Sequence, residues 1–205
     1  MVITSMENTT QRIRCFVAIE IPKAIQERLA QIQDTFRKRI GQASWVKPGN
    51  IHLTLKFIGE IEQSQLGIIE PALARATKHY HPFALQIGGV GAFPNLTRPR
   101  VIWVGVKSGA AEASALARAI DLELNRCGYP LDDKAFNPHL TLARMKGRVD
   151  MRPFVDVFRQ YDEIDNASIR VNEIALVRSQ LDAKGAIYTI LKAYALHSRS
   201  KSGGG

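Results

Sequence analysis

Two identical tetrapeptides combine side chains that can transfer protons and bind phosphate. His52-Leu53-Thr54-Leu55 recurs as His139-Leu140-Thr141-Leu142. Successive side chains of a β-strand point to opposite faces, so each copy would present an imidazole and a hydroxyl on one face and two leucines on the other. The pattern therefore predicts two half-buried strands, each with a histidine and a threonine on its polar face.

A pair of histidines suits the cleavage of a phosphodiester. Imidazole has an unperturbed pKa of roughly 6.5, so one ring can be the acid and the other the base near neutral pH, and each proton transfer typically contributes roughly 10²- to 10⁴-fold. Hydroxyls of Thr54 and Thr141 can donate to phosphate oxygens, and an arginine can stabilise the charge that develops there. Arg144, near the end of the second motif's strand, is the candidate arginine, and Lys56, the next same-face position after Thr54, is a second candidate.

Two other interpretations of the motifs are possible. A single copy would favour an ordinary half-buried strand, but packing gives no reason to select imidazole at matching places of a repeat. A zinc site needs three or four ligands, and no carboxylate, cysteine or third histidine accompanies either motif. We therefore favour catalysis and expect no metal and no other cofactor.

The surroundings of the motifs repeat as well. The motifs are 87 positions apart (139 − 52), and the same offset takes Phe16-Val-Ala-Ile to Trp103-Val-Gly-Val. Each of these apolar runs precedes a helical pattern, the motif strand, a second helical pattern and another apolar run. The chain thus reads as a duplicated β-α-β-α-β unit. Two halves related by a pseudo-two-fold axis would bring the polar faces together across a cleft.

Periodicity and turn residues divide the chain into elements. Strands are predicted at residues 13–21, 52–59, 83–93, 101–106, from 139 onward, 169–177 and 187–195, and helices at 22–41, 63–80, 113–127 and 151–158. Pro71 should kink or split the second helix. The glycine-rich run at 88–91 lacks the spacing of a dinucleotide loop and predicts a bulge or close packing. Residues 1–11 and 197–205 are expected to be a disordered start and a flexible tail around one bilobal domain at 12–196.

Composition limits the class of protein and of partner. The 205 residues are 45% hydrophobic, enough for a substantial core, and carry a formal net charge of +9. This charge favours an anionic partner, with nucleic acid ahead of a membrane, and the basic loop at 95–100 is a possible backbone contact. Two cysteines fit a reducing compartment, and no signal peptide or membrane-length segment is evident. We expect a monomeric cytoplasmic protein.

With these motifs in place, the chain resembles the RNA 2′,3′-cyclic phosphodiesterases, also called 2′-5′ RNA ligases, of the two-histidine phosphoesterase superfamily. The resemblance covers roughly residues 12–196. It rests on Arg14-Cys-Phe-Val-Ala-Ile, Trp45-Val-Lys-Pro-Gly-Asn-Ile-His-Leu-Thr-Leu-Lys-Phe-Ile-Gly-Glu, Phe93-Pro-Asn, Pro99-Arg-Val-Ile-Trp-Val-Gly, Asn137-Pro-His-Leu-Thr-Leu-Ala-Arg and Gly185-Ala-Ile-Tyr.

The resemblance implies a bilobal α+β fold in which antiparallel sheets line a central groove, with helices outside and no metal. It implies that His52 is the proton donor to the departing 3′ oxygen and His139 the proton acceptor that activates water, so that a 2′,3′-cyclic RNA end opens to a 2′-phosphate. Thr54, Thr141 and Arg144 match the family's phosphate contacts. An RNA 5′-hydroxyl in place of water would join RNA ends without ATP. Phe16 could stack on a base or simply fill the core, and we slightly favour stacking.

Two alternatives remain open at this point. One is an RNA-end-binding protein that holds the phosphate without turnover, although arginines would serve binding better than an acid-base pair. The other is a related esterase that acts on small cyclic nucleotides.

Overall fold

The protein is described by a computed structural model that covers residues 11–40, 43–152, 155–161, 164, 167–183 and 185–197. Nearly all of the predicted disordered start and flexible tail lies outside the described residues, as does the predicted helix end at Gly41.

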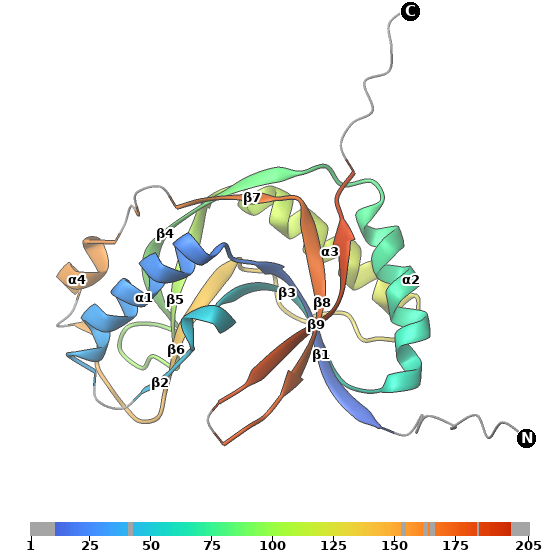
Figure 1. Cartoon of the computed structure of the whole chain (residues 1–205). Coiled ribbons are helices and arrows are strands. Elements are labelled where there is room, and N and C mark those ends of the chain that lie inside the picture. The colour runs from blue at the N-terminus through green and yellow to red at the C-terminus, as the bar shows by residue number, and fades with distance from the viewer. Residues whose placement is uncertain are drawn as a thin grey trace, which may run out of the picture.

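Strands and helices are mixed along the described chain (Figure 1). The strands are β1 (Arg12–Glu20), β2 (Ala43–Trp45), β3 (His52–Glu62), β4 (Phe83–Phe93), β5 (Val101–Ser108), β6 (His139–Met145), β7 (Ser168–Val171), β8 (Glu173–Gln180) and β9 (Ile187–Ala195). The helices are α1 (Lys23–Arg37), α2 (Leu66–Thr77), α3 (Ala110–Asn125) and α4 (Val155–Arg159), with short 3₁₀ turns η1 (Pro48–Asn50) and η2 (Gln63–Gln65).

Three details differ from the sequence-based expectations. Trp45, which lies in none of the predicted strands, belongs to a short strand, β2, which pairs with β6. The predicted strand at 169–177 is two strands, β7 and β8, divided at Asn172. Helix α2 is not split, because it continues through Pro71 from Leu66 to Thr77.

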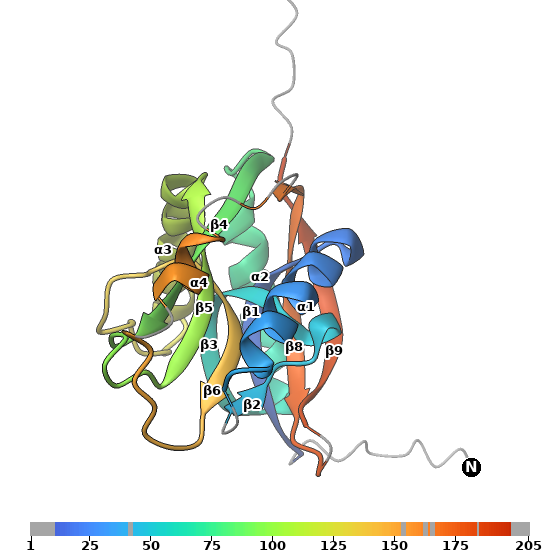
Figure 2. The same ribbon diagram turned by 90° about the vertical axis from the view of Figure 1, so that its left-hand side faces the viewer.

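All the strands belong to one antiparallel sheet in the order β7-β4-β5-β6-β3-β1-β8-β9, with β2 beside β6. The inner part of this order, from β4 to β8, reads the same from either end when β4 is exchanged for β8, β5 for β1 and β6 for β3, the strands related by 87 residues. The predicted duplication and α+β class are confirmed, and the two lobes are joined at β3 and β6 into a single curled sheet (Figures 1 and 2).

The repeats exchange their last strands. Strand β4 ends the first repeat in the sequence but pairs with β5 of the second, and β8 ends the second repeat but pairs with β1 of the first. The helices also cross between repeats, since α3 contacts β3 and α1 contacts β6. Each spatial lobe is therefore built from both halves of the chain.

The core lies between the sheet and its helices. Leu53, Leu55, Leu140 and Leu142, the leucines of both motifs, are at most 2% exposed within it. The predicted apolar faces of the motif strands therefore pack toward the helices, and the opposite faces carry the polar side chains.

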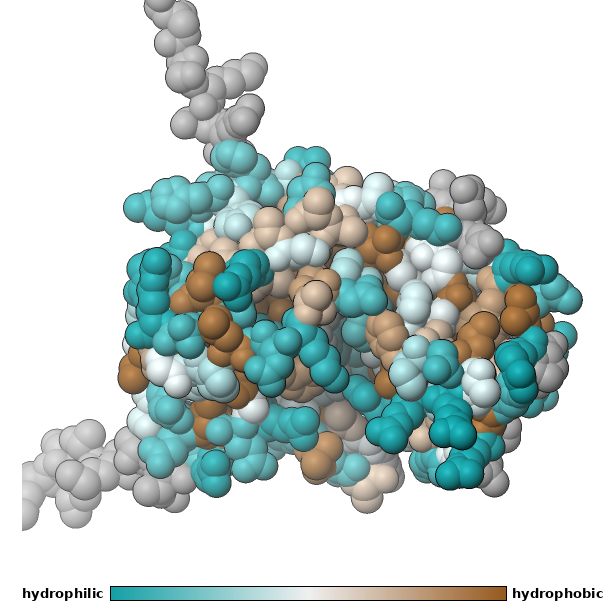
Figure 3. Space-filling view, turned by 180° about the vertical axis from the view of Figure 1, so that it is seen from behind, coloured by the Kyte–Doolittle hydropathy of each residue, from teal (hydrophilic) through white to brown (hydrophobic). Residues whose placement is uncertain are grey.

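None of the helices among the described residues combines the length and the apolarity needed to cross a membrane. Seen from behind, the molecular surface mixes hydrophilic residues with separate hydrophobic ones (Figure 3).

Candidate active site

The two motifs meet where β3 and β6 pair. Leu53 is the partner of Leu140 in this antiparallel contact, so continuing the register by one residue on each side places His52 opposite Thr141 and Thr54 opposite His139. The histidines and threonines are partly exposed on the face away from the helices. The structure thus gathers both histidines and both threonines at the centre of the sheet.

Each imidazole is oriented by a backbone carbonyl two residues earlier. His52 Nδ1 lies 2.8 Å from the Asn50 oxygen, and His139 Nδ1 lies 2.7 Å from the Asn137 oxygen. A carbonyl oxygen only accepts, so Nδ1 carries the hydrogen in both rings. Nε2 is therefore the atom of each ring that is free to accept or donate a proton.

A β-bulge brings Arg144 to the same face as His139. Trp103 pairs with Thr141 but Ile102 pairs with Ala143, so Leu142 is an extra residue in β6. Strict alternation would turn Arg144, five residues after His139, to the helix side, whereas the extra residue returns it to the polar face. The Leu142 carbonyl accepts hydrogen bonds from the Val46 backbone (3.0 Å) and the Gln33 side chain (2.9 Å), which hold the bulge.

The equivalent bulge in β3 removes Lys56 from the candidate site. Leu55 is the extra residue here, because Ala18 pairs with Thr54 but Val17 pairs with Lys56. The Lys56 side chain, 3% exposed, turns toward α3, where its ammonium donates to Asp121 Oδ1 (2.7 Å) and Asp132 Oδ1 (2.7 Å). The expectation that Lys56 is a phosphate ligand was therefore wrong, since strict alternation does not hold across a bulge.

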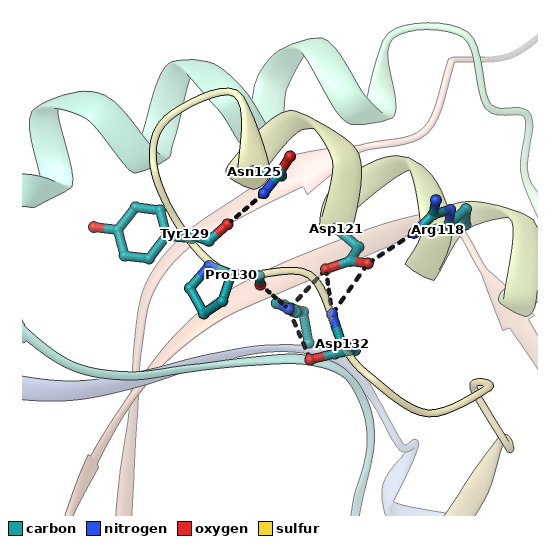
Figure 4. Close-up of polar contacts among 7 residues, drawn as sticks. Arg118, Asp121, Asn125, Tyr129, Pro130 and Asp132 are labelled. Atoms are coloured by element: carbon teal, nitrogen blue, oxygen red, sulfur yellow. Dashed lines mark hydrogen bonds and ion pairs between the residues drawn. The ribbon is translucent and has the colours of Figure 1, made fainter.

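Figure 4 shows Asp121 and Asp132, the two carboxylates that accept hydrogen bonds from Lys56. Asp121 is also contacted by Arg118 (3.1 Å) and by the backbone N–H of Asp132, and the Pro130 carbonyl accepts from Lys56 (2.9 Å). Burial by itself lowers the pKa of Lys56, but its hydrogen bonds to Asp121 and Asp132 outweigh burial and leave that pKa raised. Lys56 is thus a charged structural anchor.

Phe16 supports the His52 ring. The two rings are stacked with centroids 4.6 Å apart, and Tyr188 meets both edge-on, at 5.1 Å from Phe16 and 5.3 Å from His52. Phe16 is only 2% exposed. Neighbouring side chains cover most of the Phe16 ring, which positions His52, and stacking of Phe16 on a base stays a prediction.

Burial and positive charge act together on His52. Burial lowers the pKa of His52 below its ordinary value, and the charges of Arg144 and His139 lower it further, although the hydrogen bond to the Asn50 carbonyl acts in the opposite direction. Burial raises the pKa of Tyr188, whereas the positive charges of Arg144 and Arg14 act to lower it. The positive charge of Arg144 thus lies close enough to act on both His52 and Tyr188, and its field favours an anion there.

A pocket of about 180 Å³ opens beside His52. We call it the His52 pocket; its walls include Phe16, Asn50, Ile51, His52, Val177 and Tyr188. The side chain of Asn50 also donates to the Ala186 carbonyl (2.7 Å), which ties the turn before β3 to the β8–β9 hairpin. The hairpin is therefore held beside the His52 pocket.

Sequence reasoning missed two parts of the site. Asn50 and Asn137 are themselves 87 positions apart, so extending the comparison of the repeats by two residues would have found both carbonyls that orient the histidines. Tyr188 ends the segment Gly185-Ala-Ile-Tyr that contributed to the family resemblance, but only the structure brings β9 beside His52.

Other reactive groups lie apart from this site. Cys15 is fully buried on the core side of β1, and burial raises the pKa of its thiol to about 11. Among the described residues, no group of three or more histidine, cysteine, aspartate or glutamate side chains is arranged to hold a metal ion.

The sequence matches the family model of LigT-like phosphoesterases twice, at residues 19–103 and 104–188, with one motif in each match. Among its relatives, RNA 2′,3′-cyclic phosphodiesterase of Methanothermobacter thermautotrophicus is 32% identical over 90% of this chain and 100% of the relative. The protein of the same name from Archaeoglobus fulgidus is 36% identical over 89% of this chain and 99% of the relative.

Solved structures show the same fold. The protein TT0787 of Thermus thermophilus aligns with a TM-score of 0.75 at 28% identity, covering 92% of this chain and 100% of that one. Escherichia coli LigT complexed with 3′-AMP aligns with a TM-score of 0.73 at 26% identity, covering 91% and 99%. Motifs, fold and relatives agree, and the chain belongs to the LigT-like phosphoesterase family.

Proposed function

We propose that this phosphoesterase hydrolyses RNA ends bearing a 2′,3′-cyclic phosphate to 2′-phosphomonoesters by metal-independent acid-base catalysis. The observation that carries the proposal is the pairing of the two motif strands. It sets His52 and His139 diagonally across two neighbouring strands on the same face of the sheet, and a carbonyl oxygen holds Nδ1 of each ring. The names of the relatives support the choice of substrate.

The reaction assigns one proton transfer to each histidine. His139 Nε2 takes a proton from water, the water oxygen bonds to phosphorus, the bond from phosphorus to O3′ breaks, and His52 Nε2 gives a proton to O3′. The cationic form of His52 is required, and an anionic phosphate beside it raises the pKa that burial and Arg144 lower. Binding of the substrate thus prepares the acid.

The remaining groups stabilise charge. Thr54 and Thr141 donate hydrogen bonds to the non-bridging oxygens, and Arg144 offers positive charge at the same face. The net charge of +9 favours a polyanionic substrate. E. coli LigT has been crystallised with 3′-AMP, a nucleoside monophosphate, which supports a nucleotide in the groove of this chain too.

The same site can join RNA ends. The oxygen of an RNA 5′-hydroxyl replaces water, His139 takes the hydroxyl proton, and the bond to O3′ breaks as before, which leaves a 2′-5′ linkage. No nucleotide triphosphate is consumed, because one phosphodiester bond is exchanged for another.

Hydrolysis of an RNA oligonucleotide with a 2′,3′-cyclic phosphate end, in EDTA, tests the proposal. We expect a 2′-phosphate product, identified by chromatography against 2′- and 3′-phosphate standards and by its loss on phosphatase treatment. Bound RNA without product would overturn the enzyme in favour of an end-binding protein. A preference for cyclic mononucleotides would favour an esterase of small molecules, and a 3′-phosphate would reverse the assigned leaving group.

The proposal includes a cytoplasmic monomer that works as one unit over residues 12–196. Support for one unit comes from the site itself, which takes one histidine from each half of the chain. Light scattering of the active protein tests the monomer.

A further inference from the structure

A second pocket, of about 340 Å³, lies beside His139. We call it the Trp103 pocket; its walls include Gly88, Trp103, Gly105, Ala110, Asn137 and Pro138. Its volume lies in the range of small-molecule sites. None of the side chains assigned above to hydrolysis lines this pocket.

The Trp103 pocket is the counterpart of the His52 pocket in the other repeat. Asn137 and Pro138 directly precede His139, as Asn50 and Ile51 directly precede His52, and Trp103 corresponds to Phe16. The two pockets therefore flank the histidine pair on opposite sides, one adjoining each histidine.

Glycines make the second pocket different from the first. Gly91 is the cross-strand partner of Trp103, and Gly88 is the partner of Gly105. A Cβ atom on Gly91 would overlap the Trp103 ring, and one on Gly105 would lie 3.1 Å from its Cζ3 atom. The indole thus lies over glycines of the sheet, where no side chains separate it from the backbone, and it forms part of the pocket wall.

Packing alone does not account for this arrangement. The Trp103 Nε1–H is buried and has no hydrogen-bond acceptor among the described residues, an unfavourable state for a packed indole. Phe93 contacts Trp103 at 5.0 Å and also meets the His139 ring edge-on at 5.0 Å. The flat ring is therefore held in place next to the catalytic base, as a stacking platform for a base would be.

We propose that the Trp103 pocket binds the nucleoside that carries an attacking RNA 5′-hydroxyl. The inference rests on the proposed function, in which the nucleophile enters on the side of His139 and the cyclic nucleotide departs on the side of His52. A base stacked on Trp103 would hold the 5′-oxygen near His139 Nε2. The bond from that oxygen to phosphorus forms, its proton passes to His139, and O3′ leaves with the proton from His52.

Filling the pocket separates ligation from hydrolysis. Ala110→Leu places a larger side chain in the Trp103 pocket at the first residue of α3, and Ala111→Leu makes the same change at the next, exposed position, as a matched control. Joining of a cyclic-ended RNA to a 5′-hydroxyl oligonucleotide should fall at least tenfold relative to hydrolysis in Ala110→Leu. The ratio should stay within twofold of wild type in Ala111→Leu.

Tryptophan fluorescence gives a second readout that needs no turnover. The chain has two tryptophans, so Trp45→Phe leaves Trp103 as the reporter. Adenosine should quench this emission by stacking, and adding Ala110→Leu should abolish the quenching while adding Ala111→Leu should not.

The two readouts distinguish the outcomes. An unchanged ratio of ligation to hydrolysis in Ala110→Leu, or emission that adenosine does not quench, would overturn the second nucleoside site. If the wild-type protein hydrolyses no cyclic end, the proposed function fails, and quenching that is sensitive to Ala110→Leu would still support the nucleoside pocket.

Discussion

Identical histidine motifs have different neighbours in this molecule. His52 is stacked on Phe16 and meets Tyr188, whereas His139 meets Phe93 edge-on. Arg144 occupies the position that Phe57 occupies in the other repeat, because the two lie 87 residues apart. The surroundings, and not the motifs, therefore distinguish the two rings, and they lower the pKa of His52.

Removal of either imidazole should abolish hydrolysis of cyclic-ended RNA. We expect kcat/KM to fall by roughly 10²- to 10⁴-fold in His52→Ala and in His139→Ala, since each ring transfers one proton. Both histidines are only half-buried, so thermal unfolding should remain cooperative in the two variants. Retention of more than a third of the wild-type kcat/KM in either variant would contradict the assigned roles.

The pH dependence should reveal the influence of Arg144 on His52. The acid must be protonated, so kcat/KM should fall as pH rises through the lowered pKa of His52. Arg144→Gln removes a positive charge and should move this alkaline limb to higher pH, even though kcat itself drops. The pH profile of kcat/KM is the measurement.

Lys146→Gln is the control for this shift. It removes a similar exposed charge two residues away, and Lys146 does not contribute to the lowered pKa of His52. An alkaline limb that moves equally in both variants, or that moves to lower pH in Arg144→Gln, would contradict the effect of the Arg144 charge on the pKa of His52.

At the scale of elements, Lys56 links β3 to the segment that leads into β6. Its ammonium holds Asp121 on α3, together with Asp132 and the Pro130 carbonyl in the loop between α3 and β6. The same loop continues to Asn137, whose carbonyl orients His139. One buried cation thus joins the strand of the first motif to the approach of the second.

Lys56→Met should destabilise the protein by about 3 kcal/mol, the low end of the range for breaking a buried ion pair, because Asp132 is half-exposed. Chemical denaturation measures the change in the free energy of unfolding. Lys192→Met, which breaks the exposed pair with Glu70, should cost at most about 1 kcal/mol. Equal losses in the free energy of unfolding would contradict the larger contribution that we assign to the buried ion pair of Lys56.

At the scale of the whole molecule, the lobes are interlocked. The first repeat contributes β4 to the lobe of β5 and β6, and the second contributes β8 and β9 to the lobe of β1 and β3. A single repeat would leave long strands without partners and half of each lobe's core exposed.

Fragments 1–97 and 98–205, cut in the loop between β4 and β5, should therefore not fold separately. We expect neither fragment to show a cooperative thermal transition by circular dichroism, and we expect a refolded mixture to recover both the transition and hydrolysis. A cooperative transition in one isolated fragment would contradict the exchange of strands as a requirement for folding.

The sequence by itself determined the duplicated unit, the two strands that carry the motifs and the burial of their leucines. These follow from local periodicity and from the 87-residue repeat, which any register of the final sheet preserves. The repeat also relates Asn50 to Asn137, although the hydrogen bond from each Nδ1 to their carbonyls appeared only in the structure.

Only the tertiary structure decided which side chains join the motifs on the polar face. Bulges at Leu55 and Leu142 reverse the alternation after each motif, so Lys56 enters the core and Arg144 reaches the site. Tyr188 arrives from β9 through strand exchange, and glycines under Trp103 open the second pocket. Such outcomes depend on pairing between strands distant in the chain, and the alternation within one strand does not show where a bulge interrupts that pairing.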